Sequence, residues 1–230
     1  MPATSVTRQD GEGWSLLKLS TPDGLNKLGC ETLESLYDEL ATILSGGDCR
    51  CLAIVGEGRS FAVGADLREV GQLTPRSARE FSDLGNRVFR LMENSEAVVV
   101  AGIDGFCLGG GLDLALAADW RMATSSSVFG HPGADLGIIT GFGGTQRLGR
   151  LVGPRRSSMW IFTASRVNAR EAYNAGFLQE ICPTDRFRDA VERRVNSFSG
   201  LSPGWVGAVK NSFRHQKDGW KGVGNSPTLP

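Results

Sequence analysis

Glycine is concentrated in one part of this chain, and its positions constrain the fold more than any other feature. Thirteen of the 31 glycines fall between Gly102 and Gly153, a segment that is under a quarter of the 230 residues. There is no Gly-X-Y period, which excludes a collagen-like helix. Glycine allows positive φ angles and close approach of other groups to the main chain. We therefore expect sharp turns that pack closely against buried elements.

Short apolar runs alternate with segments of helical periodicity in the first half of the chain. The pattern predicts strands at 14–19, 51–55, 97–101 and 119–123, and helices at 32–44, 77–92 and 112–116. This alternation is typical of an α/β layer built from βαβ-type units. Further helices are predicted at 155–162, 168–175, 186–197 and 203–214. We expect a core of residues 1–153, a helical region of residues 154–214 and a disordered polar tail of residues 215–230.

Composition excludes several classes of function. The chain has 25 basic and 25 acidic residues, and this balance gives no basic surface for nucleic acid or an anionic membrane. Apolar runs are shorter than the roughly 18 residues of a membrane span, and the N-terminal sequence lacks a secretory signal. Five cysteines without a C-x-x-C motif, together with two histidines, predict reduced thiols and no metal site. A cytoplasmic protein is expected.

Two glycine turns carry the first indication of chemistry. Gly109-Gly110-Gly111 follows the predicted strand at 97–101 and opens a helix, and a turn at Gly64 follows the strand at 51–55. Two such turns after neighbouring strands could direct two main-chain amides at one point, which would form an oxyanion hole for a polarised carbonyl. A tight turn that only packs a helix on a strand explains a lone triplet equally well. Neither a G-x-G-x-x-G fingerprint nor a P-loop is present.

Several motifs together resemble the enoyl-CoA hydratase/isomerase, or crotonase, superfamily. They are Phe61–Leu67, Gly105–Asp119, Phe129–Pro132, Leu136–Ile139, Gly143–Leu148, Asn168–Ala172 and Gly176–Leu178, and the resemblance extends over roughly residues 12–214. It implies an α/β fold made of a spiral of ββα units, with two stacked sheets surrounded by helices. It also implies a C-terminal helical region that mediates trimerisation, and hence a homotrimer or a hexamer built as a dimer of trimers.

The resemblance also assigns roles to individual residues. The main-chain amides of Ala65 and Gly110 would form the oxyanion hole for the thioester carbonyl. Four residues lie where the family lines its acyl-CoA site: Leu25, Ala62, Asp66 and Leu67. An acyl-CoA is the implied substrate, with no cofactor beyond its own CoA moiety. The physical chemistry agrees, because a thioester enolate needs fixed donors in a dry site.

The chain departs from the family pattern at the catalytic carboxylates. Family hydratases have glutamates at two positions, which here are Asp113 and Gly133. Hydration generally uses two carboxylates that share a water molecule. With one carboxylate, isomerisation of an enoyl-CoA or a variant hydration is favoured, with Asp113 moving the proton. The alternatives are decarboxylation or hydrolysis of a CoA thioester, and a CoA-binding subunit without catalysis.

Other interpretations of the same side chains stay open. Asp113 is one methylene shorter than glutamate, and an aspartate in the first turns of a helix is favourable without any catalytic role. Asp135 shares a face with Gly133 if the segment is extended but not if it is helical, and a solvated aspartate is the alternative. His131 is a candidate acid/base or a structural neighbour. Helix capping explains Asp66 as well as ligand contact does.

Overall fold

Within residues 3–215, which this computed structural model describes, six strands form a large sheet in the order β1-β2-β3-β5-β7-β10. Their bounds are β1 Ser5–Gly11, β2 Trp14–Ser20, β3 Cys51–Gly56, β5 Val98–Ile103, β7 Trp120–Thr124 and β10 Glu180–Cys182. β1 and β2 form an antiparallel hairpin, and every other pairing in the sheet is parallel. Four of these strands (β2, β3, β5 and β7) are the ones that the apolar runs predict.

A smaller sheet has the order β4-β6-β8-β9 among the described residues. Its strands are β4 Ser60–Ala62, β6 Phe106–Leu108, β8 Val128–Gly130 and β9 Val167–Asn168, of which only β9 is antiparallel to its neighbour. β4, β6 and β8 each follow a strand of the large sheet, so the chain places one strand in each sheet and then forms a helix. This confirms the expected ββα spiral with two sheets surrounded by helices.

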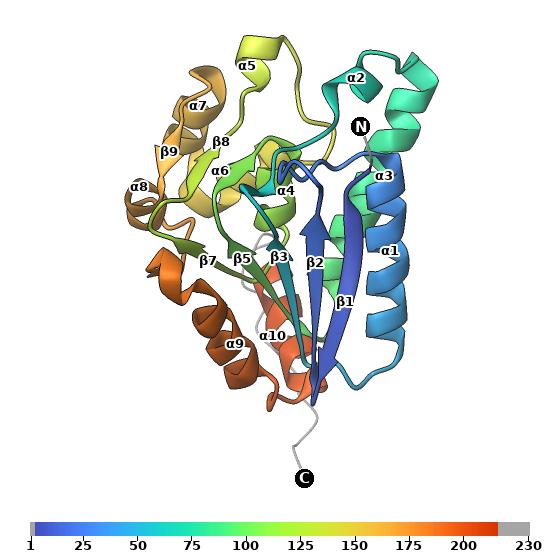
Figure 1. Cartoon of the computed structure of the whole chain (residues 1–230), viewed down its shortest axis with the longest axis vertical. Helices are drawn as coiled ribbons and strands as arrows, with labels where there is room; N and C mark the ends of the chain where they lie inside the picture. Colours follow the sequence, from blue (N-terminus) through green and yellow to red (C-terminus); the bar gives the residue numbers. More distant parts are fainter. Residues whose placement is uncertain (1–2, 216–230) are drawn as a thin grey trace.

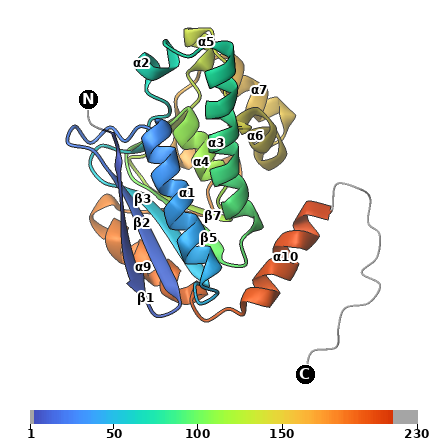
Figure 2. The same cartoon turned by 90° about the vertical axis from the view of Figure 1, so that its right-hand side faces the viewer.

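Helices cover both faces of the large sheet. They are α1 Cys30–Ser45, α2 Leu67–Val70, α3 Pro75–Asn94, α4 Gly110–Leu116, α5 Gly133–Leu136, α6 Gly144–Val152, α7 Pro154–Phe162, α8 Ala169–Asn174, α9 Phe187–Phe198 and α10 Pro203–His215, with a 3₁₀ turn at Thr184–Arg186. In Figure 2, α1 and α3 lie together on one side of the sheet, α9 lies on the other, and α10 extends away from the body. None of the helices in the described part is long and apolar enough to cross a bilayer.

Residues 154–214 are largely helical, as expected, but they also contain two short strands. β9 pairs with β8 in the small sheet, and β10 pairs with β7 at the edge of the large sheet. Both strands have three residues or fewer, too short to show a periodic apolar pattern. The predicted division at residue 153 stays a prediction. Apart from His215, the polar tail of residues 215–230 lies outside the described residues.

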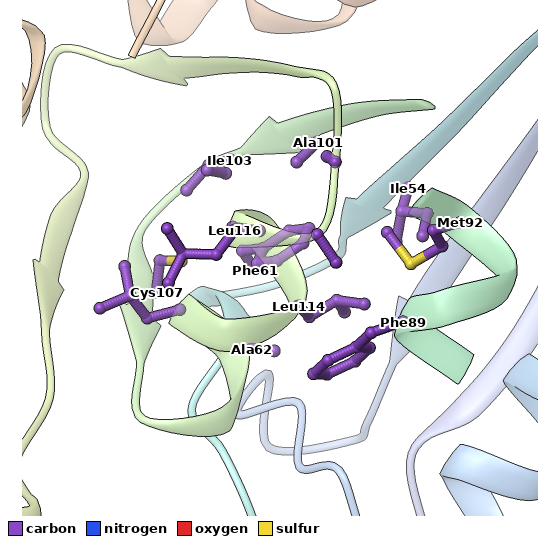
Figure 3. Packing of buried hydrophobic residues seen from close by; sticks show 14 of the residues in the cluster. Ile54, Phe61, Ala62, Phe89, Met92, Ala101, Ile103, Cys107, Leu114 and Leu116 are labelled. Atoms are coloured by element: carbon purple, nitrogen blue, oxygen red, sulfur yellow. The ribbon is translucent and has the colours of Figure 1, made fainter. Parts of the chain in front are cut away.

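The core lies where the two sheets and α4 meet (Figure 3). Phe61 and Ala62 of β4, Cys107 of β6 and Leu114 of α4 are all fully buried there. Burying one such large apolar side chain stabilises the fold by about 1.5–3 kcal/mol. Every residue of α4 from Gly111 to Leu116 is buried, so this helix is enclosed on all sides. A polar residue on α4 is therefore carried into the interior of the protein.

Candidate active site

Two glycine turns follow neighbouring parallel strands of the small sheet. The turn at Gly64 follows β4, and the turn at Gly109 follows β6. The sequence predicts them after β3 and β5, because it does not reveal the short strands in between. Gly64 has φ +90°, and a Cβ there would lie 2.8 Å from the Gly110 nitrogen and 3.2 Å from the Leu108 oxygen. The two turns therefore touch, and this contact requires glycine.

The amides of Ala65 and Gly110 are available for a ligand. Gly110 is the first residue of α4, so its N–H has no acceptor within the helix. Neither amide donates a hydrogen bond to another group within residues 3–215. Both residues line the same cavity. Two such donors, on adjoining turns at the wall of one cavity, are the kind of group that binds an oxygen atom with negative charge.

The cavity has a volume of about 350 Å³ and is mostly apolar. It lies beside α2 and α5, which Figure 1 shows together at one end of the molecule. Four apolar side chains of the lining are solvent-exposed, namely Leu67, Leu136, Ile138 and Ile139. Phe81, Phe142 and Val70 extend the apolar wall, and Ser82, His131 and Thr140 supply polar side chains. Such a site suits an apolar group attached to a polarised carbonyl.

The structure separates the predicted site residues into two groups. Ala65, Leu67, Gly110, His131 and Gly133 line the cavity. The others, which do not line it, are Leu25, Ala62, Asp66, Asp113 and Asp135.

Three of the residues outside the cavity have evident structural surroundings. Ala62 is fully buried in the core. Asp66 caps α2 by accepting from the Arg68 amide at 2.9 Å, and it forms an ion pair with Lys27 at 3.1 Å. These contacts hold the pKa of the Asp66 carboxyl below its usual value. Leu25 is half-buried in the 21–29 loop, where its amide donates to Asp23. Capping thus accounts for Asp66.

Asp135 does not replace the carboxylate that Gly133 lacks. The segment is the helical turn α5, so residues 133 and 135 point in different directions. Asp135 is exposed to solvent, whereas Gly133 is buried. The Asp135 side chain is therefore a surface group in this structure, and the interpretation as a stand-in carboxylate is wrong here.

Asp113 is fully enclosed beneath the cavity. One carboxylate oxygen, Oδ2, accepts a hydrogen bond from the Thr140 hydroxyl. The other, Oδ1, lies 3.7 Å from Nε2 of His131, and neither of these two atoms has a hydrogen-bond partner among the described residues. Gly144, the first residue of α6, passes so close that a Cβ there would overlap Oδ1. The carboxylate is thus fixed on one side and faces an imidazole on the other.

His131 and Gly133 lie side by side at the cavity wall. His131 follows β8 and is 7% exposed. A Cβ at Gly133 would lie 3.2 Å from Nδ1 of His131 and would overlap the carbonyl oxygen of Ile138. The Ile138 amide donates to the Gly133 oxygen at 3.0 Å and so closes the α5 turn. Only glycine fits this position in the observed backbone.

Side chains of two helices hold the segment from Thr140 to Gly144 in place through hydrogen bonds. Ser82 and Asn86 of α3 both donate to the Gly141 oxygen, at 2.6 and 2.8 Å. Arg147 of α6 donates to the Phe142 oxygen at 2.6 Å and pairs with Glu93 at 2.7 Å. Sequence reasoning missed Ser82, Asn86 and Thr140 as site residues. Arg147 lies in the Gly143–Leu148 motif, and this motif is the one sequence signal that indicates it.

The comparisons with known proteins show which family the chain belongs to. The model of the family described as enoyl-CoA hydratase/isomerase matches residues 10–222. The chain belongs to this family. A crotonyl-CoA hydratase from Syntrophomonas wolfei subsp. wolfei is 37% identical over 84% of this chain and 75% of the relative. A short-chain-enoyl-CoA hydratase from Clostridium acetobutylicum is 35% identical over 82% of this chain and 73% of the relative.

Solved structures of the family have the same fold. A crystal structure of an enoyl-CoA hydratase from Bacillus anthracis superimposes with a TM-score of 0.87 at 28% identity, covering 93% of this chain and 83% of that chain. Family membership confirms the resemblance that the motifs predict. It supports an acyl-CoA-processing enzyme of the enoyl-CoA hydratase type. No group of three or more His, Cys, Asp or Glu side chains that could hold a metal occurs among the described residues.

Proposed function

We propose that this protein transforms an enoyl-CoA through the enolate of its thioester, by isomerisation or by a variant hydration. The observation that carries the proposal is the pair of unsatisfied amides, those of Ala65 and Gly110, at the wall of an apolar cavity. The thioester oxygen would accept from both amides as negative charge develops on it. Loss of one donor of this kind typically lowers kcat by about 10²–10³-fold.

The acyl group would occupy the apolar part of the cavity. Leu67, Phe81 and Ile138 offer it a dry surface, and their exclusion of water strengthens the interaction of the amides with the oxyanion. The hydratase names of two relatives support an enoyl-CoA as the substrate class. A cavity of about 350 Å³ suits a small acyl group better than a long chain.

Isomerisation needs less of the site than standard hydration does. A 3-enoyl-CoA loses a proton from C2, its electrons pass to the thioester oxygen, and the dienolate then gains a proton at C4. No water is consumed, so one acid/base system can serve both steps. Asp113 and the adjoining His131 would supply that system, while Gly133 offers no second carboxylate.

The reaction is tested by offering the purified protein three thioesters. These are a 3-enoyl-CoA, crotonyl-CoA and a malonyl-type CoA, with double-bond position, thioester absorbance and CO₂ release followed in parallel. We expect turnover of the 3-enoyl-CoA, of crotonyl-CoA or of both. Turnover of the malonyl-type CoA alone, or release of free CoA, would contradict the proposal in favour of decarboxylation or hydrolysis. Binding of CoA without any turnover would indicate a non-catalytic subunit.

We also propose that the protein assembles as a homotrimer or as a dimer of trimers. Large apolar side chains are exposed on the C-terminal helices: Met159 and Phe162 on α7, and Trp205 and Phe213 on α10. Exposed apolar side chains of this size favour burial against another protein surface. Native mass spectrometry should give three or six copies, and a monomer at micromolar concentration would contradict this assembly.

A further inference from the structure

The two candidate proton carriers at the site occupy different positions. His131 is the one titratable side chain among the cavity-lining residues within the described part of the chain. Asp113 is 0% exposed and does not line the cavity, whereas His131 and Thr140, which lie on either side of its carboxylate, both do. A substrate in the cavity would therefore meet the imidazole before it met the carboxylate.

We propose that His131 is the catalytic residue that carries the proton, and that Asp113 is a positioning residue that acts through it. This inference rests on the proposed function, because it divides the acid/base role of that same site. It gives Asp113 a different task from the one that the family pattern implies. It also gives a hydrogen-bond partner to Oδ1 of Asp113 and to Nε2 of His131. Buried polar atoms are rarely left without such a partner.

The hydrogen bonds around Asp113 suit an orienting role. Thr140 accepts from the Phe142 amide at 3.1 Å and gives its hydroxyl hydrogen to Oδ2 of Asp113. Oδ1 is then left for His131. A carboxylate beside an imidazole selects which ring nitrogen carries the hydrogen and stabilises the imidazolium once it forms.

The pair is not hydrogen-bonded in the free protein, because 3.7 Å between Nε2 and Oδ1 is too long. Catalytic hydrogen bonds often shorten only when substrate is bound. The proposal therefore requires the imidazole and the carboxylate to move together by less than 1 Å, which is within reach of a side-chain adjustment.

Gly133 adjoins the other edge of the imidazole. Nε2 faces Asp113, and Nδ1 faces the cavity-lining Gly133, where even a Cβ would approach to 3.2 Å. In the observed backbone a glutamate does not fit here, because its Cβ would overlap the Ile138 oxygen. Glycine leaves no side chain beside Nδ1, so the base next to this part of the cavity wall is the His131 imidazole.

The proton balance of the isomerisation follows from this arrangement. Nδ1 takes the C2 proton with its lone pair, while the C–H electrons move into the dienolate and onto the thioester oxygen. The resulting imidazolium donates through Nε2–H to Asp113. Nδ1 then returns the proton to C4, the electrons re-form the carbonyl, and the imidazole is neutral again. No external reactant is needed.

The test compares His131→Gln, His131→Ala and Asp113→Asn with the wild-type protein on whichever enoyl-CoA it turns over. Glutamine preserves a polar side chain next to Asp113 but cannot accept a proton. We expect both His131 variants to lose about 10²–10⁴-fold in kcat, with KM changed by less than about threefold. Thermal melting and binding of butyryl-CoA show whether each variant is folded and able to bind.

Added imidazole separates a catalytic role from a structural one. Imidazole should restore part of kcat in His131→Ala, because it can enter the space that the ring leaves, and it should not restore activity in Asp113→Asn. The proposal is overturned if His131→Gln keeps kcat within about threefold of wild type while Asp113→Asn is inactive. Absence of turnover in the wild type would instead remove the proposed function and this inference together.

Discussion

At the scale of single residues, two glycines set the positions of the groups that surround the cavity. Gly64 lets the β4 turn touch the start of α4, and Ala65 and Gly110, which lie on these two segments, line the same cavity. Gly144 lets α6 pass against the Asp113 carboxylate. In both places, the missing Cβ allows main chain to approach a functional group. Replacement of either glycine by alanine should therefore have its own measurable effect.

Replacement of Gly64 by alanine should move the two amides apart. The new Cβ would strain a backbone with φ +90° and press on the Gly110 nitrogen at 2.8 Å. We expect a loss of about 1–3 kcal/mol in stability and a fall in kcat of about 10²-fold or more. Gly47→Ala is the matched control, because Gly47 has φ +72° but no atom within 4 Å of its Cβ position. Equal kcat values for the two variants would contradict this account.

Replacement of Gly144 by alanine should displace the Asp113 carboxylate. Overpacking of a filled site costs about 1–3 kcal/mol, and the displaced carboxylate would no longer face His131. Gly149→Ala, in the same helix, places its Cβ 3.6 Å from Ser157 Oγ and should be neutral or slightly stabilising. Chemical denaturation and steady-state kinetics check both effects. Wild-type kinetics in Gly144→Ala would mean that the position of Asp113 is not important.

The sequence indicates most directly those candidate site residues that would act through their main chain. Ala65 and Gly110 lie in recognisable glycine motifs, and both line the cavity. Thr140 was not predicted, because its contact with Asp113 depends on how a loop folds across 27 residues of chain. Asp135 was ambiguous because its orientation depends on whether four residues form a helical turn, which sequence pattern does not decide over so short a segment.

At the scale of elements, the segment between α5 and α6 is the part of the cavity wall that has least secondary structure of its own. It is held by α3 through Ser82 and Asn86 and by α6 through Arg147. The Phe142 ring also packs against Phe81 and Phe89 of α3, with centroids 5.1 and 5.8 Å apart. The position of Thr140, and through it that of Asp113, depends on these anchors.

Removal of the Arg147 guanidinium should loosen this wall. Arg147→Met keeps an apolar stem over the Phe89 ring but loses the bonds to the Phe142 oxygen and to Glu93. Hydrogen bonds to charged groups contribute about 1.5–3 kcal/mol each, so we expect lower stability and a fall in kcat of about tenfold or more. Arg150→Met, at an exposed position of the same helix, is the control. If Arg147→Met and Arg150→Met lose activity equally, the contacts of Arg147 do not explain the loss.

Most of the longer helices and the buried strands of the large sheet were predictable from the sequence, whereas β1, α6 and every element of two to four residues were not. α1 and α3 show clear helical spacing, and Thr74 adds a capping box to the start of α3. β4, β6 and β8 have three residues each, all but one of which are buried or half-buried, so neither alternation nor length marks them. The family resemblance, and not periodicity, is what predicted a second sheet.

At the scale of the whole molecule, a buried lysine attaches the C-terminal helix α10 to the body of the protein. Lys210 of α10 is 8% exposed and donates to the main-chain oxygens of Met92 and Ala97 and to the Ser95 hydroxyl. It also pairs with Asp119 at 2.7 Å. These contacts attach α10 to the body between the end of α3 and the start of β5, and the helix as a whole extends away from the body (Figure 2). Trp205 and Phe213 of this helix stay exposed, as the proposed assembly requires.

The buried thiols should be unreactive in the folded protein. Burial raises the pKa of the Cys51, Cys107 and Cys182 thiols, so at neutral pH they carry their proton and the reactive thiolate is scarce. Burial, aided by Glu69, also raises the pKa of Cys30 to about 12. A disulfide reagent at pH 7.5 should label Cys51, Cys107 and Cys182 only after the protein unfolds. All five cysteines should then react. Rapid labelling of Cys107 in the native protein would contradict the described core.

The central claim is that a thioester enolate forms between the Ala65 and Gly110 amides, with the proton handled by His131 and Asp113. Exchange of the C2 hydrogens of butyryl-CoA in D₂O, followed by mass spectrometry, tests it without assuming a net reaction. Wild-type protein should incorporate deuterium at C2, His131→Ala should incorporate it at least about 10²-fold more slowly, and Gly47→Ala should match wild type. Tight binding of butyryl-CoA by the wild-type protein without deuterium incorporation would contradict the claim.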